Sequence, residues 1–274
     1  LAYEASTAGG IPVIRGIQTG LNSNRINQVL GILNGTSNYI LTRMSQDGWD
    51  YQTALTKAQE LGYAEADPTN DVEGYDAQRK ILLLSRLAYN KSLNLEDVSV
   101  RGISRIEVQD LAQAAQAGYT MKLLGTSRLN EADNSVSINV EPVLLASSHQ
   151  LAHVNDAMNS VFVKGNGVGE AMFYGPGAGG LATASAVVSD VMNIATQSQH
   201  FNFLPTEKAR VVADTTAKAY YIRLQAAPTK ADWVETELVN DSDRFVAVSQ
   251  AITPTELAEI SQDAAFVVAY PIEA

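Results

Sequence analysis

The sequence predicts an α+β fold: a mixed β-sheet with helices on one face, followed by a small βαβ-type domain. Three observations support this. Apolar residues recur at helical spacing in 50–61 and 73–89. Segments 121–128 and 136–145 alternate like paired strands. Strand-like and helix-like segments then alternate near the C-terminus, which divides the chain into domains at 1–200 and 207–274.

Composition limits the functional classes. The chain has 274 residues, 46% of them hydrophobic, enough for one large domain or two ordinary ones. A net charge of -11 and a pI near 4.7 argue against nucleic-acid and anionic-membrane partners. The chain contains no cysteine, which fits a reducing cytoplasm. No apolar run reaches membrane-spanning length and no signal peptide is recognisable, so we expect a cytoplasmic protein without a membrane partner.

The N-terminal half is expected to place one buried strand among helices. A helix start at Asn22 or Ser23 precedes the apolar run 29–33, which is typical of a buried strand. Thr36 or Ser37 is the expected cap of the next helix, Asn34 and Thr36 are interpreted as structural caps, and Asp50 caps the helix 50–61. Pro68 prevents helix between 61 and 73.

The C-terminal half is expected to be richer in strands. Its predicted elements are strand 98–107, helix 110–116 closed by Gly118, the strands 121–128 and 136–145, a strand starting at Phe162, a strand at 171–174 and helix 183–197. After a linker at 200–206, we expect strand 219–226, helix 230–237, strand 244–251, helix 254–262 capped by Thr253, and strand 265–270.

The acid-rich segment 62–80 is the main candidate for chemistry. Glu65 and Asp71 are expected on a loop, whereas Asp76 and Lys80 lie one turn apart on the same helix face. A lysine beside a carboxylate keeps its charge and can protonate an oxygen that becomes negative during reaction. Nearby carboxylates can hold an ammonium group, so the set suits a small zwitterion. The alternative, a solvated surface pair beside an ordinary loop, stays open from these residues alone.

The same segment carries a long motif, Ala58-x3-Gly62-Tyr63-x3-Asp67-Pro68-x2-Asp71-Val72-x-Gly74-x-Asp76-x3-Lys80. It resembles the signature of the homoserine dehydrogenase family. The resemblance implies that Lys80 is the catalytic acid/base, that Glu65 and Asp76 bind homoserine, and that Gly62 contributes a backbone contact. Asp71 would support these residues from behind.

The N-terminal run Glu-Ala-Ser-Thr-Ala-Gly-Gly-Ile-Pro also resembles this family. The resemblance implies a sodium ion held by the Glu4 carboxylate and by the backbone carbonyls of Thr7, Gly9 and Ile11. A carboxylate with several carbonyls is suitable for a hard cation. The alternative is a glycine-rich turn that leads into a strand.

A second glycine motif, Gly175-Pro-Gly-Ala-Gly-Gly, satisfies G-x-G-x-x-G between a predicted strand and a helix. Pro176 removes a backbone donor, and no second strand with a terminal acid follows, so it does not begin a nucleotide-binding unit. The resemblance implies instead that Gly179 contacts the nicotinamide cofactor, NAD or NADP, and that the following helix packs on a nucleotide-binding domain. That domain is not found in residues 1–274, so we expect this chain by itself to be inactive.

The last segment resembles a shortened ACT-type regulatory domain. No glycine follows Gly180, although ACT domains that sense amino acids usually have one after their first strand. A structural or dimerising role is therefore at least as well supported as ligand binding, and a homodimer is expected.

The leading hypothesis is an oxidoreductase that interconverts L-homoserine and L-aspartate 4-semialdehyde with NAD(P), in threonine and methionine biosynthesis. Two alternatives remain: a dimeric regulatory module that has lost its chemistry, and the C-terminal part of an aspartokinase–homoserine dehydrogenase fusion. The presence of Glu65, Asp76 and Lys80 favours the enzyme.

Overall fold

The computed structural model describes residues 1–196, 205 and 207–273. Up to residue 195 it contains η1 (Glu4–Ser6), α1 (Val13–Arg15), the π-helix η2 (Gly16–Gly20), β1 (Ile26–Ile32), α2 (Gly35–Asp47), α3 (Tyr51–Glu60), α4 (Thr69–Val72), α5 (Tyr75–Tyr89), β2 (Lys91–Ser92), η3 (Leu95–Asp97), β3 (Ser99–Val100), α6 (Val108–Gln116), β4 (Tyr119–Asn130), β5 (Ser135–Ala146), η4 (Gln150–His153), β6 (Met158–Gly165), β7 (Gly169–Pro176) and α7 (Gly180–Ala195). After it come β8 (Glu207–Lys208), β9 (Arg210–Val211), β10 (Tyr220–Leu224), β11 (Val234–Asn240), β12 (Phe245–Ser249), α8 (Pro254–Ile260) and β13 (Phe266–Glu273).

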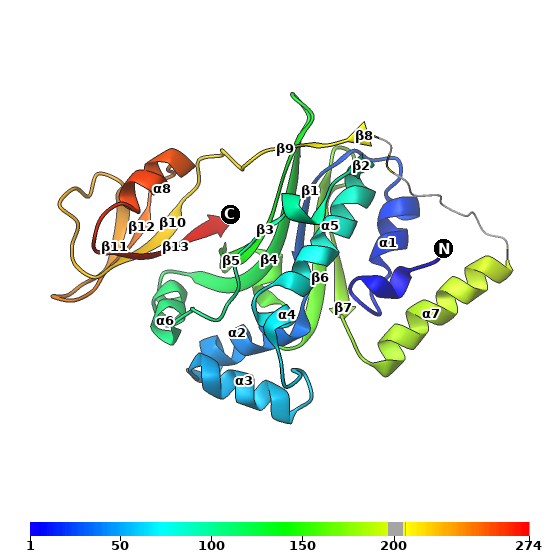
Figure 1. Cartoon of the computed structure of the whole chain (residues 1–274), viewed down its shortest axis with the longest axis horizontal. Helices are drawn as coiled ribbons and strands as arrows, with labels where there is room; N and C mark the ends of the chain where they lie inside the picture. The colour runs from blue at the N-terminus through cyan, green and yellow to red at the C-terminus, as the bar shows by residue number, and fades with distance from the viewer. Residues whose placement is uncertain (197–204, 206, 274) are drawn as a thin grey trace.

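A mixed sheet runs through the whole molecule (Figure 1). Its strand order over the described residues is β11-β12-β10-β13-β5-β4-β1-β6-β7. β4 and β5 form a long antiparallel hairpin, and β1 lies between β4 and β6. β3, β9 and β13 each pair with β5 in parallel, which makes the sheet mixed. The predicted α+β class with a mixed sheet is confirmed.

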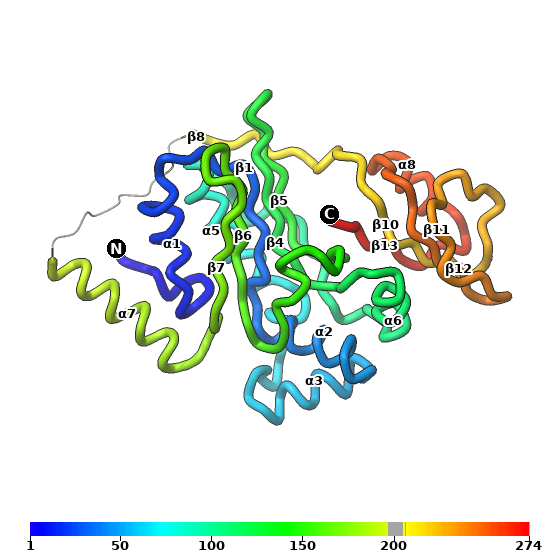
Figure 2. Tube along the Cα trace, turned by 180° about the vertical axis from the view of Figure 1, so that it is seen from behind, coloured from blue at the N-terminus to red at the C-terminus, as the bar shows by residue number. Residues whose placement is uncertain are grey.

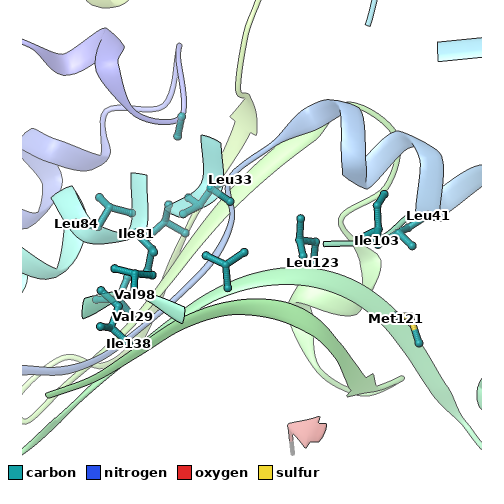
Figure 3. Packing of buried hydrophobic residues seen from close by; sticks show 14 of the residues in the cluster. Val29, Leu33, Leu41, Ile81, Leu84, Val98, Ile103, Met121, Leu123 and Ile138 are labelled. Atoms are coloured by element: carbon teal, nitrogen blue, oxygen red, sulfur yellow. The ribbon is translucent and has the colours of Figure 1, made fainter. Parts of the chain in front are cut away.

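The sheet has differently covered faces because successive strand residues point to opposite sides. Helices α2 and α5 pack on one face, where Val29, Leu33, Ile81 and Leu123 are buried together (Figure 3). The opposite face buries a smaller cluster that includes Leu30, Leu124 and Phe162 beneath the segment around η4. Figure 2 shows this segment in front of the sheet. The α5 face therefore carries the larger core, and the residues of the 62–80 segment lie beside it.

The C-terminal unit, β10–β13 with α8, forms the antiparallel order β11-β12-β10-β13 and has its own apolar cluster. It is joined to the main sheet in two ways. The end of β13 pairs in parallel with β5 at Ile272↔Leu144 and Glu273↔Leu145. In addition, β10 side chains contact α6 through Asp110, which is fully buried.

Two expectations for the N-terminal half are wrong. No helix begins at Asn22 or Ser23, since residues 21–24 form a turn that Asn24 fastens to the β6–β7 hairpin. The Asn24 Oδ1 accepts the N–H groups of Gly167 at 3.2 Å and Val168 at 2.7 Å, and β1 then begins at Ile26. The expected cap at Thr36 or Ser37 is wrong, whereas the interpretation of Asn34 as a cap is confirmed, since the Asn34 side chain accepts the Ser37 N–H at the start of α2.

The expected strand 98–107 is also wrong beyond Val100. The Arg101 N–H still bonds to the Val140 carbonyl on β5, at 2.8 Å. Two residues later the Ile103 N–H bonds to the Val72 carbonyl, also at 2.8 Å. The chain therefore leaves the sheet edge and packs against α4.

In the C-terminal unit, the expected helix 230–237 is wrong. Residues 225–233 are an irregular crossover, and β11 runs from Val234 to Asn240 against β12. The segment Val-Glu-Thr-Glu-Leu-Val contains β-branched residues in alternation, which favours an extended strand. The helix at α8 is confirmed, with Thr253 and Glu256 forming a capping box. The linker predicted at 200–206 lies, apart from Pro205, outside the described residues.

Candidate active site

Lys80 lies in the second turn of α5, and its side-chain nitrogen makes two hydrogen bonds. Its Nζ donates to the Asp76 Oδ2 at 2.6 Å and to the Leu33 carbonyl at 3.0 Å. The side chains of Lys80 and Asp76 are 20% and 28% exposed, so both are reachable from solvent. The predicted pairing on one helix face is confirmed. The two hydrogen bonds fix the direction of the Lys80 amine group.

Asn34 joins the loop carboxylates to α5. Its Nδ2 donates to the Asp71 Oδ1 at 2.7 Å and to the Asp76 Oδ2 at 3.0 Å, while its Oδ1 caps α2. The sequence alone indicates only a capping role for Asn34. Its position at the end of a buried strand is visible in the sequence, but its contacts lie 37 and 42 residues away along the chain. Asn34 therefore both starts a helix and positions two acids.

Asp71 is half-buried in this cluster, and it lies in the short helix α4 rather than on a loop. Burial raises the pKa of the Asp71 carboxyl. The Asn34 hydrogen bond and the Lys80 charge lower this pKa, and the charges of Asp76 and Glu65 raise it further. Three other residues of the 62–80 segment, Glu65, Asp76 and Lys80, thus influence the pKa of Asp71.

Gly62 and Glu65 lie on the loop between α3 and α4. Gly62 has φ +75°, a left-handed backbone that glycine adopts without strain. The loop is fixed by the Gln59 Nε2, which donates to the Glu65 carbonyl at 3.0 Å, and by the Thr36 hydroxyl, which donates to the Tyr63 carbonyl. The Glu65 residue is exposed. The loop position predicted for Glu65 is confirmed, and its carboxylate is free to meet a ligand.

The N-terminal loop predicted to hold sodium is arranged around Glu4, which is 4% exposed. The Glu4 carboxylate accepts the N–H groups of Ile14 at 2.9 Å and Arg15 at 3.1 Å, so it caps the short helix α1. Burial raises the pKa of Glu4. In the same loop, the buried Thr7 hydroxyl has no hydrogen-bond partner in the described part of the chain. The Ile11 carbonyl accepts the Val13 N–H at 2.8 Å.

The two glycine-rich segments are packed against each other. The Gly10 N–H donates to the Pro176 carbonyl at 3.2 Å, and a Cβ on Gly9 would lie 2.4 Å from the Gly177 carbonyl oxygen. Gly179 directly precedes α7, and a Cβ there would meet no atom within 4 Å. The structure thus brings the predicted cation loop beside Gly179. Figure 1 shows α7 at one edge of the molecule, with α1 between α7 and α5.

α7 exposes an unusual number of apolar side chains for a helix that lies at one edge of the molecule. Its inner side is fixed by Asp190, which accepts the Glu4 N–H at 3.0 Å and pairs with Arg15 at 3.2 Å. Among the residues that are half exposed or more are Leu181, Val187, Val188, Val191, Met192 and Ile194. No helix among the described residues has the length and apolar character needed to cross a bilayer.

The chain is similar to proteins of one known family. The sequence profile of the homoserine dehydrogenase family matches residues 12–192. The homoserine dehydrogenase of Bacillus subtilis is 48% identical over 192 residues, which covers 70% of this chain and 44% of that protein.

Two solved structures extend the comparison. A homoserine dehydrogenase from Thiobacillus denitrificans matches with a TM-score of 0.90 at 34% identity, covering 99% of this chain and 69% of that one. A hyperthermophilic archaeal homoserine dehydrogenase in complex with NADPH matches with a TM-score of 0.61 at 26% identity, covering 72% of this chain and 56% of that one. The chain spans about half the length of the curated relatives that it matches. The chain belongs to the homoserine dehydrogenase family.

Proposed function

We propose that this chain provides the substrate-binding and proton-transfer site of an enzyme that interconverts L-homoserine and L-aspartate 4-semialdehyde with NAD(P). The observation that carries the proposal is the Lys80 ammonium group, held by Asp76 and the Leu33 carbonyl beside Asp71 and Glu65. The family assignment gives this arrangement its reaction. Of the two alternatives, an inactive regulatory module is disfavoured because the polar set is complete. The aspartokinase fusion concerns sequence outside this chain.

The proposed roles follow from charge and position. In reduction of the semialdehyde, the Lys80 ammonium group donates its proton to the aldehyde oxygen; in oxidation of homoserine, neutral Lys80 accepts the hydroxyl proton. Asp76 directs the Lys80 ammonium group through its hydrogen bond, and Asp76 with Glu65 binds the substrate ammonium group. The Gly62 backbone bounds the substrate. Asp71 acts through Asn34 and Asp76 rather than by touching substrate.

We place the cofactor contact of this chain at Gly179. The backbone there has no side chain in the way and starts α7, whose first N–H groups point toward any polar group bound at the helix end. When bound, the nicotinamide supplies the hydride transfer. The related archaeal structure is a complex with NADPH, which supports a nicotinamide cofactor without choosing between NAD and NADP for this chain. The exposed apolar face of α7 would pack against a nucleotide-binding domain.

The C-terminal unit is proposed to be ACT-like and the protein a homodimer. The strand order β11-β12-β10-β13, with α8 between the last two strands in sequence, is the order of a βαββαβ unit that lacks its first helix. The missing helix corresponds to the irregular crossover 225–233. The unit also lacks glycine, so we assign it a structural role first.

Substitutions of Asn34 are predicted to separate its two roles, which are the positioning of Asp71 and Asp76 and the capping of α2. Asn34→Ser keeps an oxygen that can cap α2 but removes the donor to Asp71 and Asp76. Because the lost hydrogen bond lowered the pKa of Asp71, that pKa should rise further, as measured by NMR titration of the carboxyl carbon. The KM for homoserine should rise while the unfolding midpoint stays near that of the native protein. Asn34→Ala should add a loss of about 1 kcal/mol in stability. Equal destabilisation by both variants would refute a separate positioning role.

We propose a sodium ion at the N-terminal loop, bound by the Glu4 carboxylate and the carbonyls of Thr7, Gly9 and Ile11. The buried Thr7 hydroxyl, which has no hydrogen-bond partner among the described residues, supports the fit because a buried oxygen is satisfied when a cation lies nearby. We predict a higher thermal midpoint in sodium chloride than in choline chloride at the same ionic strength. The difference should vanish in Glu4→Gln and persist in Glu60→Gln, a change on an exposed helix face. The same midpoint for the native protein in both salts would contradict the site.

The experiment that tests the main proposal is homoserine-dependent reduction of NAD and of NADP by the complete gene product. Reduction that depends on L-homoserine, and is absent with L-alanine, supports the assignment. A folded protein that reduces neither cofactor would favour the regulatory alternative.

A further inference from the structure

Asn159, the second residue of β6, has a buried side-chain oxygen that lacks a partner. The residue is 1% exposed, and its Oδ1 has no hydrogen-bond partner among the residues that the structure describes. An unpaired buried acceptor is unfavourable, so such atoms in native proteins usually receive a hydrogen bond from a ligand, a water or an ion. The Asn159 carboxamide therefore has an acceptor available for a bound group.

This carboxamide lies against the glycine-rich segment that leads into α7. A Cβ on Gly177 would be 2.1 Å from the Asn159 Cγ and 2.5 Å from its Oδ1, so a residue other than glycine could not pass over this side chain. Two residues later, Gly179 has φ +111° and directly precedes α7. Glycine adopts such conformations without strain, so the backbone at Gly177 and Gly179 can turn and uncover the carboxamide when a ligand binds. Asn159 thus lies beside the helix terminus at which we place the cofactor contact.

The register of the sheet places Asn159 between this segment and the group that holds Lys80. On one side, Asn159 pairs with Gly175 on β7. On the other side, β6 pairs with β1 in a register that brings Asn159 level with Leu33, the residue directly after β1. The Leu33 carbonyl accepts the Lys80 Nζ. Neighbouring strands lie about 4.8 Å apart, so the backbone of Asn159 is about one strand spacing from both Leu33 and Gly175.

The Asn159 side chain is on the face of the sheet that α5 covers. Asn159 is two residues from Val161, which belongs to the core cluster on that face, and residues two apart in a strand point to the same side. Figure 3 shows Leu33 on this face beside α5. The start of β6 is also fixed to α2, because the Asn38 Nδ2 donates to the Met158 carbonyl at 3.2 Å. The carboxamide therefore has a fixed backbone on the same face as the proton-transfer site.

We propose that Asn159 binds the carboxamide of the nicotinamide ring, with the Asn159 Oδ1 accepting one of its N–H groups. Hydride leaves or enters at the ring carbon next to the one that carries the carboxamide. A nicotinamide that reacts at the Lys80 site must therefore place its carboxamide within a few ångströms of that site. The substrate ammonium group is assigned to Asp76 and Glu65 and the reacting oxygen to Lys80, so the nicotinamide carboxamide is the donor that remains. The inference rests on the proposed function.

The test is isothermal titration of the complete gene product with NAD, NADP and their 3-acetylpyridine analogues, in which a methyl group replaces the amide nitrogen. An analogue keeps the ring charge and the carbonyl group but has no N–H to donate. For the cofactor that the native protein binds more tightly, we expect the analogue to bind about tenfold more weakly, the effect of about one hydrogen bond. In Asn159→Ala, the cofactor and its analogue should bind equally, both near the affinity of the native protein for the analogue.

Two controls separate this contact from a structural role. Asn139→Ala removes a carboxamide on β5 that donates to Glu141, and it should keep the tenfold difference. The thermal midpoint of Asn159→Ala without cofactor should stay near that of the native protein, because the Asn159 Oδ1 makes no hydrogen bond within the described part of the chain for the substitution to remove. The titrations of the native protein need no variant, so they test the contact even if Asn159→Ala folds poorly.

Equal affinity of the native protein for the cofactor and its analogue would overturn the proposal. A tenfold preference that persists in Asn159→Ala would also overturn it: with native affinities, the nicotinamide carboxamide contacts another group, and with both affinities lowered, Asn159 only shapes the glycine-rich segment. Either result, in a protein that reduces NAD or NADP with homoserine, would remove this contact and leave the proposed function standing. A folded gene product that binds neither nucleotide would overturn both.

Discussion

Lys80→Ala is expected to lower the kcat for homoserine oxidation by about 10²- to 10⁴-fold, the range in which a positioned acid/base contributes. The substitution removes the only cation that contacts the Asp76 carboxylate among the described residues. It also removes the charge that lowers the pKa of Asp71, so the repulsion from Asp76 and Glu65 is no longer offset and this pKa should rise. Stability should fall by about 1 kcal/mol or less, since a partly exposed pair contributes little to folding. The measurement is steady-state kinetics of the complete gene product alongside urea-induced unfolding.

Lys57→Ala is the matched control, because Lys57 forms an exposed pair with Glu60 on α3 and makes no ion pair with Asp71 or Asp76 in the part of the chain that the structure describes. It should leave both kcat and stability nearly unchanged. Lys80→Met keeps the length of the side chain without its charge and should be as impaired as alanine. Turnover retained by Lys80→Met would assign the proton transfer to another group. A loss of activity in proportion to unfolded protein would make Lys80 a structural residue.

The sequence predicted the Lys80–Asp76 pair because helical periodicity fixes which residues share a face. The loop position of Glu65 was predicted for a different reason, because Pro68 is incompatible with the interior of a helix. Asn34 was predicted only as a possible cap. Capping depends on residues nearby in the sequence, whereas the hydrogen bonds of Asn34 to Asp71 and Asp76 do not. Its amide meets Asp71 and Asp76 only after β1 and α5 have packed side by side. Sequence therefore predicted the candidate acid/base pair and missed the hydrogen bonds that Asn34 makes to Asp71 and Asp76.

The same reasoning explains the errors in the sheet. The alternation of 121–128 and 136–145 predicted β4 and β5 because their pairing partner is the next strand. The residue patterns of 98–107 and 230–237 are compatible with more than one type of secondary structure. Hydrogen-bond partners that are distant in the sequence determine which type forms. The chain leaves β3 because the Ile103 N–H bonds to the Val72 carbonyl, and β11 forms because it pairs with the edge of β12. The parallel pairing of β13 with β5 is equally non-local.

Asp110→Ala is expected to destabilise the chain by about 3–5 kcal/mol, the cost of removing one partner from a buried charge network. Asp110 is fully buried, and its Oδ1 accepts the Tyr221 hydroxyl at 2.8 Å and an Arg244 N–H at 3.0 Å. The Arg223 Nε is at 3.1 Å. Without this carboxylate, two arginines of the C-terminal unit face α6 with only the half-exposed Glu107 to balance them.

The location of this network also determines which part of the chain should unfold first. Trp233 lies in the core of the C-terminal unit and Trp49 in the main part, so fluorescence of the variants Trp49→Phe and Trp233→Phe reports each part separately. In Asp110→Ala, the urea midpoint reported by Trp233 should fall more than that reported by Trp49, since the arginines belong to β10 and the segment before β12. Glu131→Ala, which breaks an exposed pair with Arg25, should move neither midpoint appreciably. If Asp110→Ala behaved like Glu131→Ala, the two units would be held together by the β13–β5 pairing and apolar packing, and the buried charges would contribute no net stability.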